Sequence, residues 1–364
     1  MNVVPVAIER LGVVCTSYPQ HDSDTAGSFV RTHLQRWAAR APGRSVDVVA
    51  VGPERKQSPT EIGIVHRVES RGLFTSAGAP ETWECSAGLQ RIGMLVESVR
   101  VTLALAHEIR QRCLSWTEVH SHWMVPSAVA VALVAPALRH TAYVHSADVS
   151  ALESLPQARV LLAWLLPRVS RVVCVSQDLA VRLRTLAGGR WPAGLALNVK
   201  PMPVAASVFG SQRTGLHKER SGVLAVGRLV PIKGFDVLLL AAAGLPRTVR
   251  PTITLLGEGP QRKRLEEMAK GLNLRVDMPG AVAPAQVAAA MAAAKVCVIP
   301  SRTLANGRTE GFPLVASEAI QSGVKLIASR IGGLSELEQE INVRMVNPGD
   351  PRSLRAALAA ALCM

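Results

Sequence analysis

Aromatic residues are scarce in this chain of 364 residues, because Phe, Trp and Tyr together make up only 4% of it. Hydrophobic residues nevertheless reach 48%, and Ala, Val and Leu supply most of them. This composition disfavours an aromatic-rich β-sandwich and suits helices packed closely on parallel sheets. The length also exceeds that of one ordinary core, so two α/β domains are expected.

Paired cysteines are missing as well. No two of the cysteines form a Cys-x-x-Cys pair, and they stand far apart in the sequence. Isolated cysteines are typical of reduced core residues in a cytosolic protein, rather than of a disulfide framework or a zinc site. They are Cys15, Cys85, Cys113, Cys174, Cys297 and Cys363.

No long hydrophobic run suggests export or a membrane anchor. Residues 1–5 carry no charged segment followed by an apolar segment of signal-peptide length. The most apolar stretch, Trp123 to Leu138, is interrupted by two prolines and a serine and falls short of a membrane span. A cytoplasmic protein is therefore expected, with any membrane association peripheral and at the inner membrane face.

Acidic residues are outnumbered. The chain has 41 Lys and Arg against 27 Asp and Glu, which gives a formal net charge of +14. This balance predicts an anionic partner, and the candidates are nucleic acid, an anionic membrane face and a phosphorylated substrate. The sequence contains no run of five basic residues and no basic stripe flanked by aromatics, so no nucleic-acid partner is expected.

Short apolar, β-branched runs alternate with helical patterns along the chain. This alternation predicts two doubly wound parallel α/β sheets, whose ligands bind at the carboxyl ends of the strands. A Pro-rich and then polar stretch separates the two sets, so the boundary is placed near residue 205, giving domains 1–205 and 206–364. The runs are Leu11 to Cys15, Val46 to Val51, Ala142 to His145, Arg171 to Ser176, Val223 to Gly227, Thr252 to Leu256, Lys295 to Pro300 and Val324 to Ala328.

Two cations follow the first predicted strand of the second half. Arg228 and Lys233 stand before a helix that is expected to open at Phe235 or Asp236. Pro231 is expected to keep the segment out of helix, which lets both side chains turn toward the binding edge. Two cations beside a helix N-terminus can hold a pyrophosphate, although two basic surface residues remain the alternative for this pattern alone.

Two carboxylates follow the predicted strand at residues 295–300. Glu310 stands just before a helix, and Glu318 lies further along it. Pro313 fits the first turn of this helix and Gly323 fits its C-terminal cap. The backbone N–H groups from Gly311 to Leu314, Pro313 excepted, could then meet hydroxyl or phosphate oxygens. The arrangement suits a sugar at one end and a ribose at the other; a Glu that aids the helix dipole and a solvated Glu are the alternative.

A series of short motifs runs in a fixed order along almost the whole chain. In the C-terminal half they are Gly227-Arg228 with Lys233-Gly234, Gly257-Glu258-Gly259-Pro260, Pro300-Ser301, Glu310 to Glu318, and Gly332-Gly333 with Glu336. In the N-terminal half they are Thr16-Ser17-Tyr18-Pro19, Ala26-Gly27-Ser28-Phe29-Val30, His120-Ser121-His122-Trp123, His145-Ser146-Ala147-Asp148 and Val175-Ser176. In their order and spacing, these motifs resemble those of family-four GT-B retaining glycosyltransferases, the group 1 glycosyl transferases.

The resemblance implies the GT-B fold, in which two doubly wound Rossmann-like domains face a central cleft. It further implies a retaining hexosyltransferase that uses a UDP- or GDP-sugar donor. The acceptor would be a saccharide or a lipid-linked molecule in cell-surface polysaccharide or glycoconjugate synthesis. The N-terminal domain would bind this acceptor, the C-terminal domain would bind the donor, and neither a cofactor nor a metal would be required.

The resemblance also implies a role for each donor-site residue. Arg228 and Lys233 would hold the pyrophosphate and stabilise the leaving nucleotide. Glu310 would engage the sugar, and Glu318 the ribose hydroxyls. A front-face attack, in which the departing phosphate takes the acceptor proton, is favoured over a covalent Glu310 intermediate. The other donor-binding positions are Gly311, Phe312, Pro313 and Leu314.

In the N-terminal half, Gly27 would let the backbone approach the donor, and His145 would stand near the reacting carbon. The chain departs from the family at Ser146, where glycine is usual, and this could narrow the loop around the donor sugar. Family members also continue past the helix that follows Pro348-Gly349-Asp350-Pro351. This sequence stops at Met364, so the usual terminal helices are expected to be missing.

Two patterns would suit a metal, and both have a plainer interpretation. Asp22-Ser23-Asp24 spells the Asp-x-Asp of metal-dependent glycosyltransferases, but Arg228 and Lys233 already supply charge that neutralises phosphate. His120 and His122 would share one face of a strand, but no third ligand stands near them in sequence. A structural or acceptor-side role is therefore expected for the histidines.

Two other functions stay open. A nucleotide-sugar epimerase of the same architecture would convert the donor sugar without any acceptor. A catalytically degenerate, basic binding protein would bind no nucleotide sugar at all.

Overall fold

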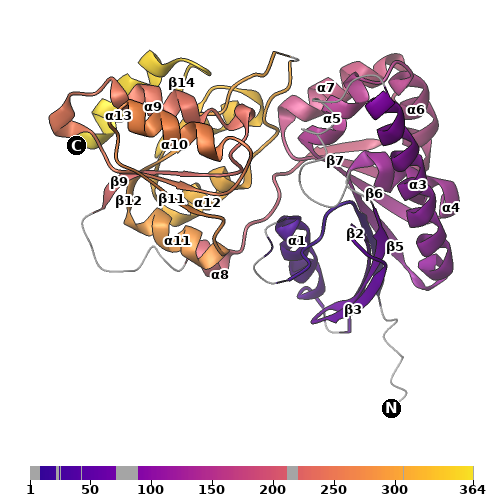
Figure 1. The fold of residues 1–364 in the computed structure, drawn as a ribbon. Coiled ribbons are helices and arrows are strands. Elements are labelled where there is room, and N and C mark those ends of the chain that lie inside the picture. Colours follow the sequence, from indigo (N-terminus) through magenta and orange to yellow (C-terminus); the bar gives the residue numbers. More distant parts are fainter. Residues whose placement is uncertain are drawn as a thin grey trace. The chain divides into compact units, whose positions relative to one another are not determined.

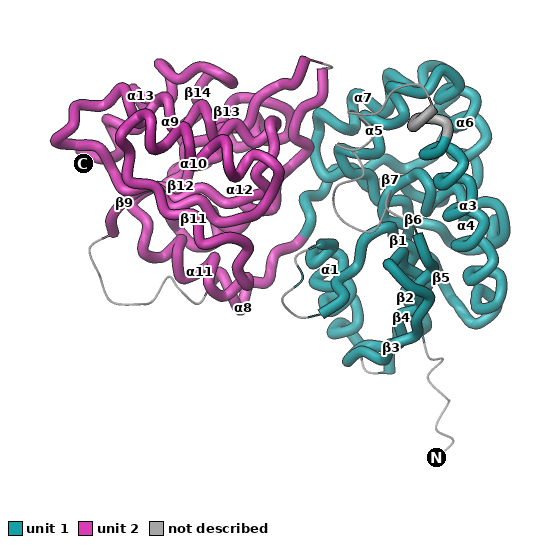
Figure 2. Tube along the Cα trace, viewed as in Figure 1, with its two compact units in different colours: residues 1–202 teal, residues 203–364 magenta. Residues whose placement is uncertain are grey.

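The computed structural model describes residues 9–21, 24, 26–41, 43–70, 89–210, 220–305 and 307–363. The chain divides into two compact units, Met1–Met202 and Pro203–Met364 (Figure 2). The sequence suggested a boundary near residue 205, and contacts within the chain place it just before Pro203.

An eight-stranded sheet forms the centre of the N-terminal unit, in the order β3-β4-β2-β1-β5-β6-β7-β8. The pairings are parallel except for β3 with β4, which is antiparallel. The strands are β1 (Arg10–Cys15), β2 (Ser45–Gly52), β3 (Lys56–Thr60), β4 (Gly63–Glu69), β5 (Glu118–His122), β6 (Arg139–Val144), β7 (Arg171–Cys174) and β8 (Ala196–Val199).

Helices cover both faces of this sheet, and α1 lies on the face opposite α3 and α4 (Figure 1). Successive residues of β1 explain the arrangement: Val13 packs with Leu34 of α1, whereas Val14 packs with Leu105 of α3. Because side chains alternate along a strand, each strand contributes to two cores. The helices are α1 (Ser28–Ala38), α3 (Leu89–Arg112), α4 (Val129–Val134), α5 (Ser146–Glu153), α6 (Ala158–Leu165) and α7 (Gln177–Ala187).

The C-terminal unit has a six-stranded sheet in the order β11-β10-β9-β12-β13-β14, and its pairings are parallel. Its strands are β9 (Ser221–Val226), β10 (Ile253–Leu256), β11 (Val276–Gly280), β12 (Ala294–Ile299), β13 (Lys325–Ser329) and β14 (Val343–Val346). Parallel sheets of this kind are covered on both faces, which accounts for the almost continuous burial of β12 and β13.

Two helical layers again divide the core of the C-terminal unit. Val296 of β12 packs in the cluster that includes α9, α10 and α13, whereas Cys297 packs in the cluster that includes α8, α11 and α12. These helices are α8 (Ala206–Phe209), α9 (Phe235–Ala243), α10 (Arg262–Gly271), α11 (Pro284–Ala293), α12 (Leu314–Ser322) and α13 (Pro351–Cys363). The prediction of two doubly wound α/β sheets is confirmed.

The eight strands expected from the sequence are present, with their ends shifted by a few residues. β3, β4, β8, β11 and β14 were not expected, and β5 was considered only as a strand on which His120 and His122 would share a face. β3 and β8 are largely exposed at the two edges of the sheet. β3 has the polar sequence KQSPT, so no apolar run identifies it, and β8 is only four residues long.

Burial of the cysteines follows the expectation only in part. Cys15, Cys174 and Cys297 are buried and free, but Cys113 is half-buried and Cys363 is exposed. Cys85 lies outside the described residues. Among the described helices, none is long and apolar enough to cross a bilayer.

Candidate functional site

The strand order of the C-terminal unit identifies its binding edge. β9 lies between β10 and β12, so the chain leaves β9 toward one side of the sheet and later returns to its other side. Loops that follow the two strands at such a switch point diverge, and ligands of doubly wound sheets bind there. The predicted donor residues lie on these two loops, because Arg228 and Lys233 follow β9 and Glu310 follows β12.

The loop after β9 turns sharply before helix α9. The sequence suggested that Pro231 would keep this segment free of helix. That expectation is wrong, because Pro231–Lys233 forms one 3-10 turn. A proline fits the first position of such a turn, where its missing N–H is not needed. The α-helix itself begins at Phe235, as expected, after Gly234 at φ 64°. A Cβ atom built on Gly234 would overlap the carbonyl oxygen of Pro300, so glycine lets this turn approach the end of β12.

Lys233 and Glu310 meet at the switch point. Lys233 Nζ lies 2.8 Å from Glu310 Oε2, and their side chains are only 18% and 11% exposed. An ion pair this far removed from water depends on its geometry, because the two charges have lost most of their hydration. The structure therefore brings together a predicted phosphate-binding cation and a predicted sugar-binding carboxylate, and in the free protein each neutralises the other.

The loop after β13 packs against the backbone of the Glu310 segment. Gly333 N donates a hydrogen bond of 2.8 Å to the carbonyl oxygen of Gly311. Its neighbour Gly332 has φ 49°, and a Cβ atom built there would overlap the carbonyl oxygen of Glu310. These contacts join the loop after β13 to the Glu310 segment and fix its backbone.

Arg228 lies where the loops after β9 and β10 touch. Leu229 N donates a 2.8 Å hydrogen bond to the carbonyl oxygen of Glu258, and a Cβ atom on Gly257 would overlap the carbonyl oxygen of Gly227. The turn at residues 257–260 thus packs against the backbone on both sides of Arg228. Arg228 itself is half-buried.

Helix α12 presents its N-terminus beside Glu310. Pro313 is the cap residue that directly precedes the helix, one position earlier than the sequence suggested, and the helix begins at Leu314. Gly323 ends the helix at φ 67°, as expected. Further along the same helix, burial raises the pKa of Glu318 to about 7. A carboxyl group tuned in this way changes its charge near neutral pH.

Arg302 also contributes to this site, and it was not predicted from the sequence. Arg302 Nη1 donates a 3.0 Å hydrogen bond to Asp236 Oδ2 at the start of α9, and Arg302 Nε donates to the carbonyl oxygen of Pro231 at 2.9 Å. Arg302 therefore fastens the turn that carries Lys233 to the loop after β12. Only the fold brings these distant segments together, and no local motif marks them.

The N-terminal unit has a switch point of its own, because β1 lies between β2 and β5. Gly27 follows β1 and caps α1 with φ 71°. A Cβ atom on Gly27 would overlap the carbonyl oxygen of Ser17. Glycine therefore lets the backbone at residue 27 pack closely against the backbone of its own loop at Ser17. A contact between Gly27 and a donor stays a prediction.

The Asp-x-Asp pattern lies in this same loop. The carboxylate of Asp24 accepts hydrogen bonds of 2.9 Å from the backbone N–H groups of Gln20 and Ala26. Asp22 and Ser23 lie outside the described residues. Asp24 thus has a structural role, which is to hold the turn that leads to Gly27.

Buried Arg67 of β4 holds the other part of the loop. Its guanidinium donates to the carbonyl oxygens of Tyr18 at 3.1 Å and Pro19 at 2.6 Å. An arginine with a fixed fork of donors suits such a task, because it can satisfy several backbone carbonyls at once. Like Arg302, it was missed because its partners lie far away in sequence.

His145 follows β6 and caps helix α5. Its backbone N–H donates to Asp148 Oδ2 at 2.7 Å, and its Nε2 lies 3.3 Å from Nδ1 of His122. The rings of Phe29 and Trp123 lie beside it, with centroids 5.0 and 4.9 Å away. Burial lowers the pKa of His145 to about 3, so the imidazole is neutral at physiological pH.

The histidines of β5 belong to a larger group. His120 and His122 occupy one strand and share a face, as the sequence suggested, and His33 of α1 joins them with Nε2 3.5 Å from Nδ1 of His120. Within the described ranges, no group of three or more His, Cys, Asp or Glu residues could hold a metal ion. The absence of a metal requirement stays a prediction.

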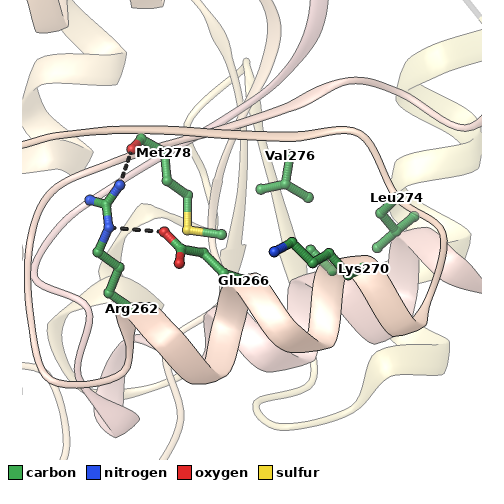
Figure 3. A pocket seen from close by; sticks show the side chains of 7 residues that line it. Arg262, Glu266, Lys270, Leu274, Val276 and Met278 are labelled. Atoms are coloured by element: carbon green, nitrogen blue, oxygen red, sulfur yellow. Dashed lines mark hydrogen bonds and ion pairs between the residues drawn. The ribbon is translucent and has the colours of Figure 1, made fainter.

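A separate shallow pocket lies between α10 and the edge strand β11 (Figure 3). Arg262 lies at one end of it (Figure 3), with Nη2 2.5 Å from the carbonyl oxygen of Met278 and Nε 2.9 Å from Glu266 Oε1. β11 is two strands away from β9 in the sheet, so this pocket is distinct from the Lys233 site.

Comparison with solved structures supports the architecture. Sucrose-phosphate synthase from Thermosynechococcus elongatus superimposes with a TM-score of 0.73 at 20% identity, covering 98% of this chain and 90% of that one. The protein HepE from Anabaena, solved in complex with UDP, has a TM-score of 0.64 at 18% identity, covering 97% and 89%. The two doubly wound units therefore define a GT-B fold.

Sequence relatives narrow the assignment. Residues 220–363 match the family model described as "Glycosyl transferases group 1". A GDP-mannose-dependent alpha-(1-6)-phosphatidylinositol monomannoside mannosyltransferase of Mycobacterium tuberculosis is 30% identical over 66% of this chain and 65% of its own. An uncharacterised glycosyltransferase of Methanocaldococcus jannaschii is 26% identical over 60% and 57%. The chain thus matches under two thirds of the length of these relatives. The similarity to the group 1 glycosyl transferases thus lies in the C-terminal unit, over residues 220–363.

Proposed function

We propose that this protein is a retaining glycosyltransferase that moves a hexose from a UDP- or GDP-sugar to a saccharide or lipid-linked acceptor. The observation that carries the proposal is the pairing of Lys233 with Glu310 at the switch point of the C-terminal sheet. A cation for the diphosphate and a carboxylate for the sugar are what a nucleotide-sugar site needs side by side.

Donor binding would exchange partners within this pair. The diphosphate of a nucleotide sugar attracts Lys233 and Arg228, and Lys233 then leaves Glu310. Glu310 becomes free to accept hydrogen bonds from the sugar hydroxyls, while the backbone N–H groups at the start of α12 meet other donor oxygens. Glu318, further along the same helix, would accept from the ribose.

The chemistry follows from charge stabilisation. A nucleoside diphosphate is a good leaving group, and fixed cations lower the barrier by stabilising the charge that develops on it. Arg228 and Lys233 fill this role without a metal ion. His145 is neutral at physiological pH, so it would contribute as a hydrogen-bonding group rather than as an acid. The departing phosphate would take the acceptor proton, so the acceptor would attack the sugar from the face that the phosphate leaves. The anomeric configuration of the sugar would then be retained.

The named relatives support the choice of donor and acceptor. The mycobacterial relative is described as GDP-mannose-dependent and acts on a phosphatidylinositol mannoside, and HepE was solved with UDP. A uracil or guanine nucleotide and a saccharide or lipid-linked acceptor are the corresponding proposals for this chain. The cytoplasmic, metal-independent character expected from the sequence belongs to the same proposal.

Turnover of radiolabelled UDP- and GDP-hexoses tests the proposal, with cell-envelope lipid extract and oligosaccharides as acceptors. We expect transfer of label to an acceptor, and loss of that transfer in Glu310→Ala and Lys233→Ala. Full activity in both variants would refute the proposed site. Conversion of the donor sugar without an acceptor would instead identify an epimerase.

A further inference from the structure

Exposed aliphatic side chains gather on one helical layer of the N-terminal unit. The described residues include twelve exposed large hydrophobic side chains, and seven of them lie on α3, α4, α6 and α7. The crossovers from β4 through to β8 advance in one direction along the sheet, so right-handed connections place all four helices on one face. The seven side chains are Leu95, Val96, Val99, Leu103, Leu133, Val160 and Val181.

Helix α3 contributes a continuous stripe to this layer. Leu95, Val96, Val99 and Leu103 are 45% to 63% exposed, and their spacing of three and four residues puts them on one side of the helix. The opposite side carries Val101, Leu105 and Ile109, which are fully buried against the sheet. A helix that is apolar on both sides is expected to have a second apolar environment beyond the protein core.

Acidic side chains on this layer are neutralised. Glu97 pairs with Arg100 at 2.7 Å, and buried Glu108 pairs with Arg112 at 2.6 Å. On the neighbouring helices, Glu153 and Asp178 both bind the single residue Arg182. The carboxylates that could repel an anionic surface are thus already occupied by arginine.

Arginines remain on the same layer in excess. Within the part of the chain that the structure describes, three arginines on these helices and Arg168, in the turn just after α6, form no ion pair, and two of these four stack on tryptophans. Arg168 lies over the ring of Trp164 at 4.8 Å, and Arg184 lies over the ring of Trp191 at 5.0 Å. The four arginines are Arg110, Arg159, Arg168 and Arg184.

We propose that the outer surface of α3, α4, α6 and α7 docks on an anionic lipid bilayer. Aliphatic side chains would enter the boundary between headgroups and acyl chains, while arginine and half-exposed tryptophan meet the headgroups. Nucleic acid would satisfy the arginines but would leave the aliphatic stripe in water. The contact is interfacial, since none of these helices could cross a bilayer.

The first half of the α3 stripe lies at the binding edge of the N-terminal sheet. Ser70 Oγ, just after β4, donates to Glu97 Oε1 at 2.8 Å, and Arg100 Nη2 donates to the carbonyl oxygen of Glu69 at 3.0 Å. The carboxyl end of β4 thus lies beside residues 95–100. Docking would bring this edge to the membrane, where a lipid-linked acceptor resides. The access to a lipid-linked acceptor rests on the proposed function, whereas the docking itself is independent of that function.

Vesicle flotation tests the docking with the full chain. The probes are vesicles of phosphatidylcholine alone and of phosphatidylcholine mixed with phosphatidylglycerol. We expect flotation with the anionic vesicles, weakening as salt rises, and weak flotation with the neutral ones. The variants Val96→Glu and Leu103→Glu should each weaken partition roughly tenfold, because an aliphatic group that would be buried becomes charged.

Matched controls keep this test specific. Leu240→Glu changes an aliphatic residue of α9 in the other unit that is also exposed, at 45%, and should leave flotation unchanged. Thermal melts of all variants should agree with the parent, since the replaced side chains face solvent. Absence of flotation with anionic vesicles, or equal loss in Leu240→Glu, would overturn the docking.

Two further results would also count against the proposal. One is a homodimer, measured by light scattering, that Val96→Glu dissociates; the other is salt-sensitive RNA binding that replaces vesicle binding. Nucleotide binding by calorimetry is measured on the same variants. Its failure would refute the proposed donor site while leaving the flotation result in force.

Discussion

Lys233 Nζ lies 2.8 Å from Glu310 Oε2, although the two residues follow different strands, β9 and β12, on either side of the switch point of the C-terminal sheet. In the proposed complex, the diphosphate would replace Glu310 as the partner of Lys233, and the sugar hydroxyls would replace Lys233 as the partner of Glu310. The ion pair therefore keeps the proposed phosphate-binding cation and the proposed sugar-binding carboxylate neutralised in the free protein.

Replacing Glu310 by Gln should separate nucleotide binding from catalysis. The amide no longer pairs with the charge of Lys233, so the affinity for a nucleoside diphosphate should stay the same or rise. Transfer should fall roughly a hundredfold, the scale expected when one well-placed polar group is lost from an active site. Calorimetry and turnover measure the two effects, and Glu338→Gln, at an exposed ion pair with Arg330, is the control. Equal losses of binding and turnover would contradict the exchange of partners.

Gly234→Ala should destabilise the C-terminal unit. The residue has φ 64°, and the new Cβ atom would overlap the carbonyl oxygen of Pro300. We expect a loss of at least about 1–3 kcal/mol in the free energy of unfolding. Gly271→Ala is the matched control, because a Cβ atom there meets nothing within 4 Å. Urea denaturation measures both, and similar midpoints for the two variants would show that the turn tolerates a side chain.

Stability should fall with pH below about 6.5. Burial lowers the pKa of His33 and His140 to about 4 and that of His145 to about 3, from the ordinary histidine value of 6.5. Between about pH 6.5 and 4 the unfolded chain binds protons that the folded chain does not, so the free energy of unfolding decreases as pH falls. Each such group adds up to about 1.4 kcal/mol per pH unit to the slope. Buried His120 and His122 act in the same direction, whereas the raised pKa values of Asp148 and Glu318 oppose it.

Urea denaturation at several pH values measures this slope. His140→Asn removes one of these groups, so the slope should decrease by up to about 1.4 kcal/mol per pH unit. An unchanged slope in that variant would show that the acid sensitivity arises from other groups.

Donor binding should strengthen as pH rises through neutrality. Burial raises the pKa of Glu318 to about 7. In the proposed role, the ionised carboxylate would accept hydrogen bonds from two ribose hydroxyls, whereas the protonated form would retain less accepting capacity. Calorimetry at pH 6 and pH 8 should show tighter binding at the higher pH, with the difference removed in Glu318→Gln. A difference that persists in Glu318→Gln would assign it to another group.

The sequence predicts the position of the donor residues better than their contacts. Lys233 and Glu310 each follow a strongly apolar strand, and the carboxyl ends of parallel strands share one edge, so both could be placed near a ligand. Their pairing with each other could not, because it depends on the approach of the Gly234 turn to Pro300.

Long-range polar contacts escaped prediction for the same reason. Arg302 and Asp236 stand 66 residues apart, and His33 stands 87 residues from His120, so no local pattern links them. The strand β3, with the sequence KQSPT, is polar and exposed at the sheet edge, where the apolar signal of a strand is missing. Such features arise from the packed fold rather than from local periodicity.

The most direct test of the donor site is calorimetry of the purified protein with UDP, GDP and ADP, with and without Mg²⁺. We predict binding of UDP or GDP that does not require the metal and that is lost in Lys233→Ala. Lys263→Ala, at an exposed lysine of α10, should bind like the parent. Failure to bind any of the three nucleotides, or unchanged binding in Lys233→Ala, would contradict the account and favour a non-catalytic role.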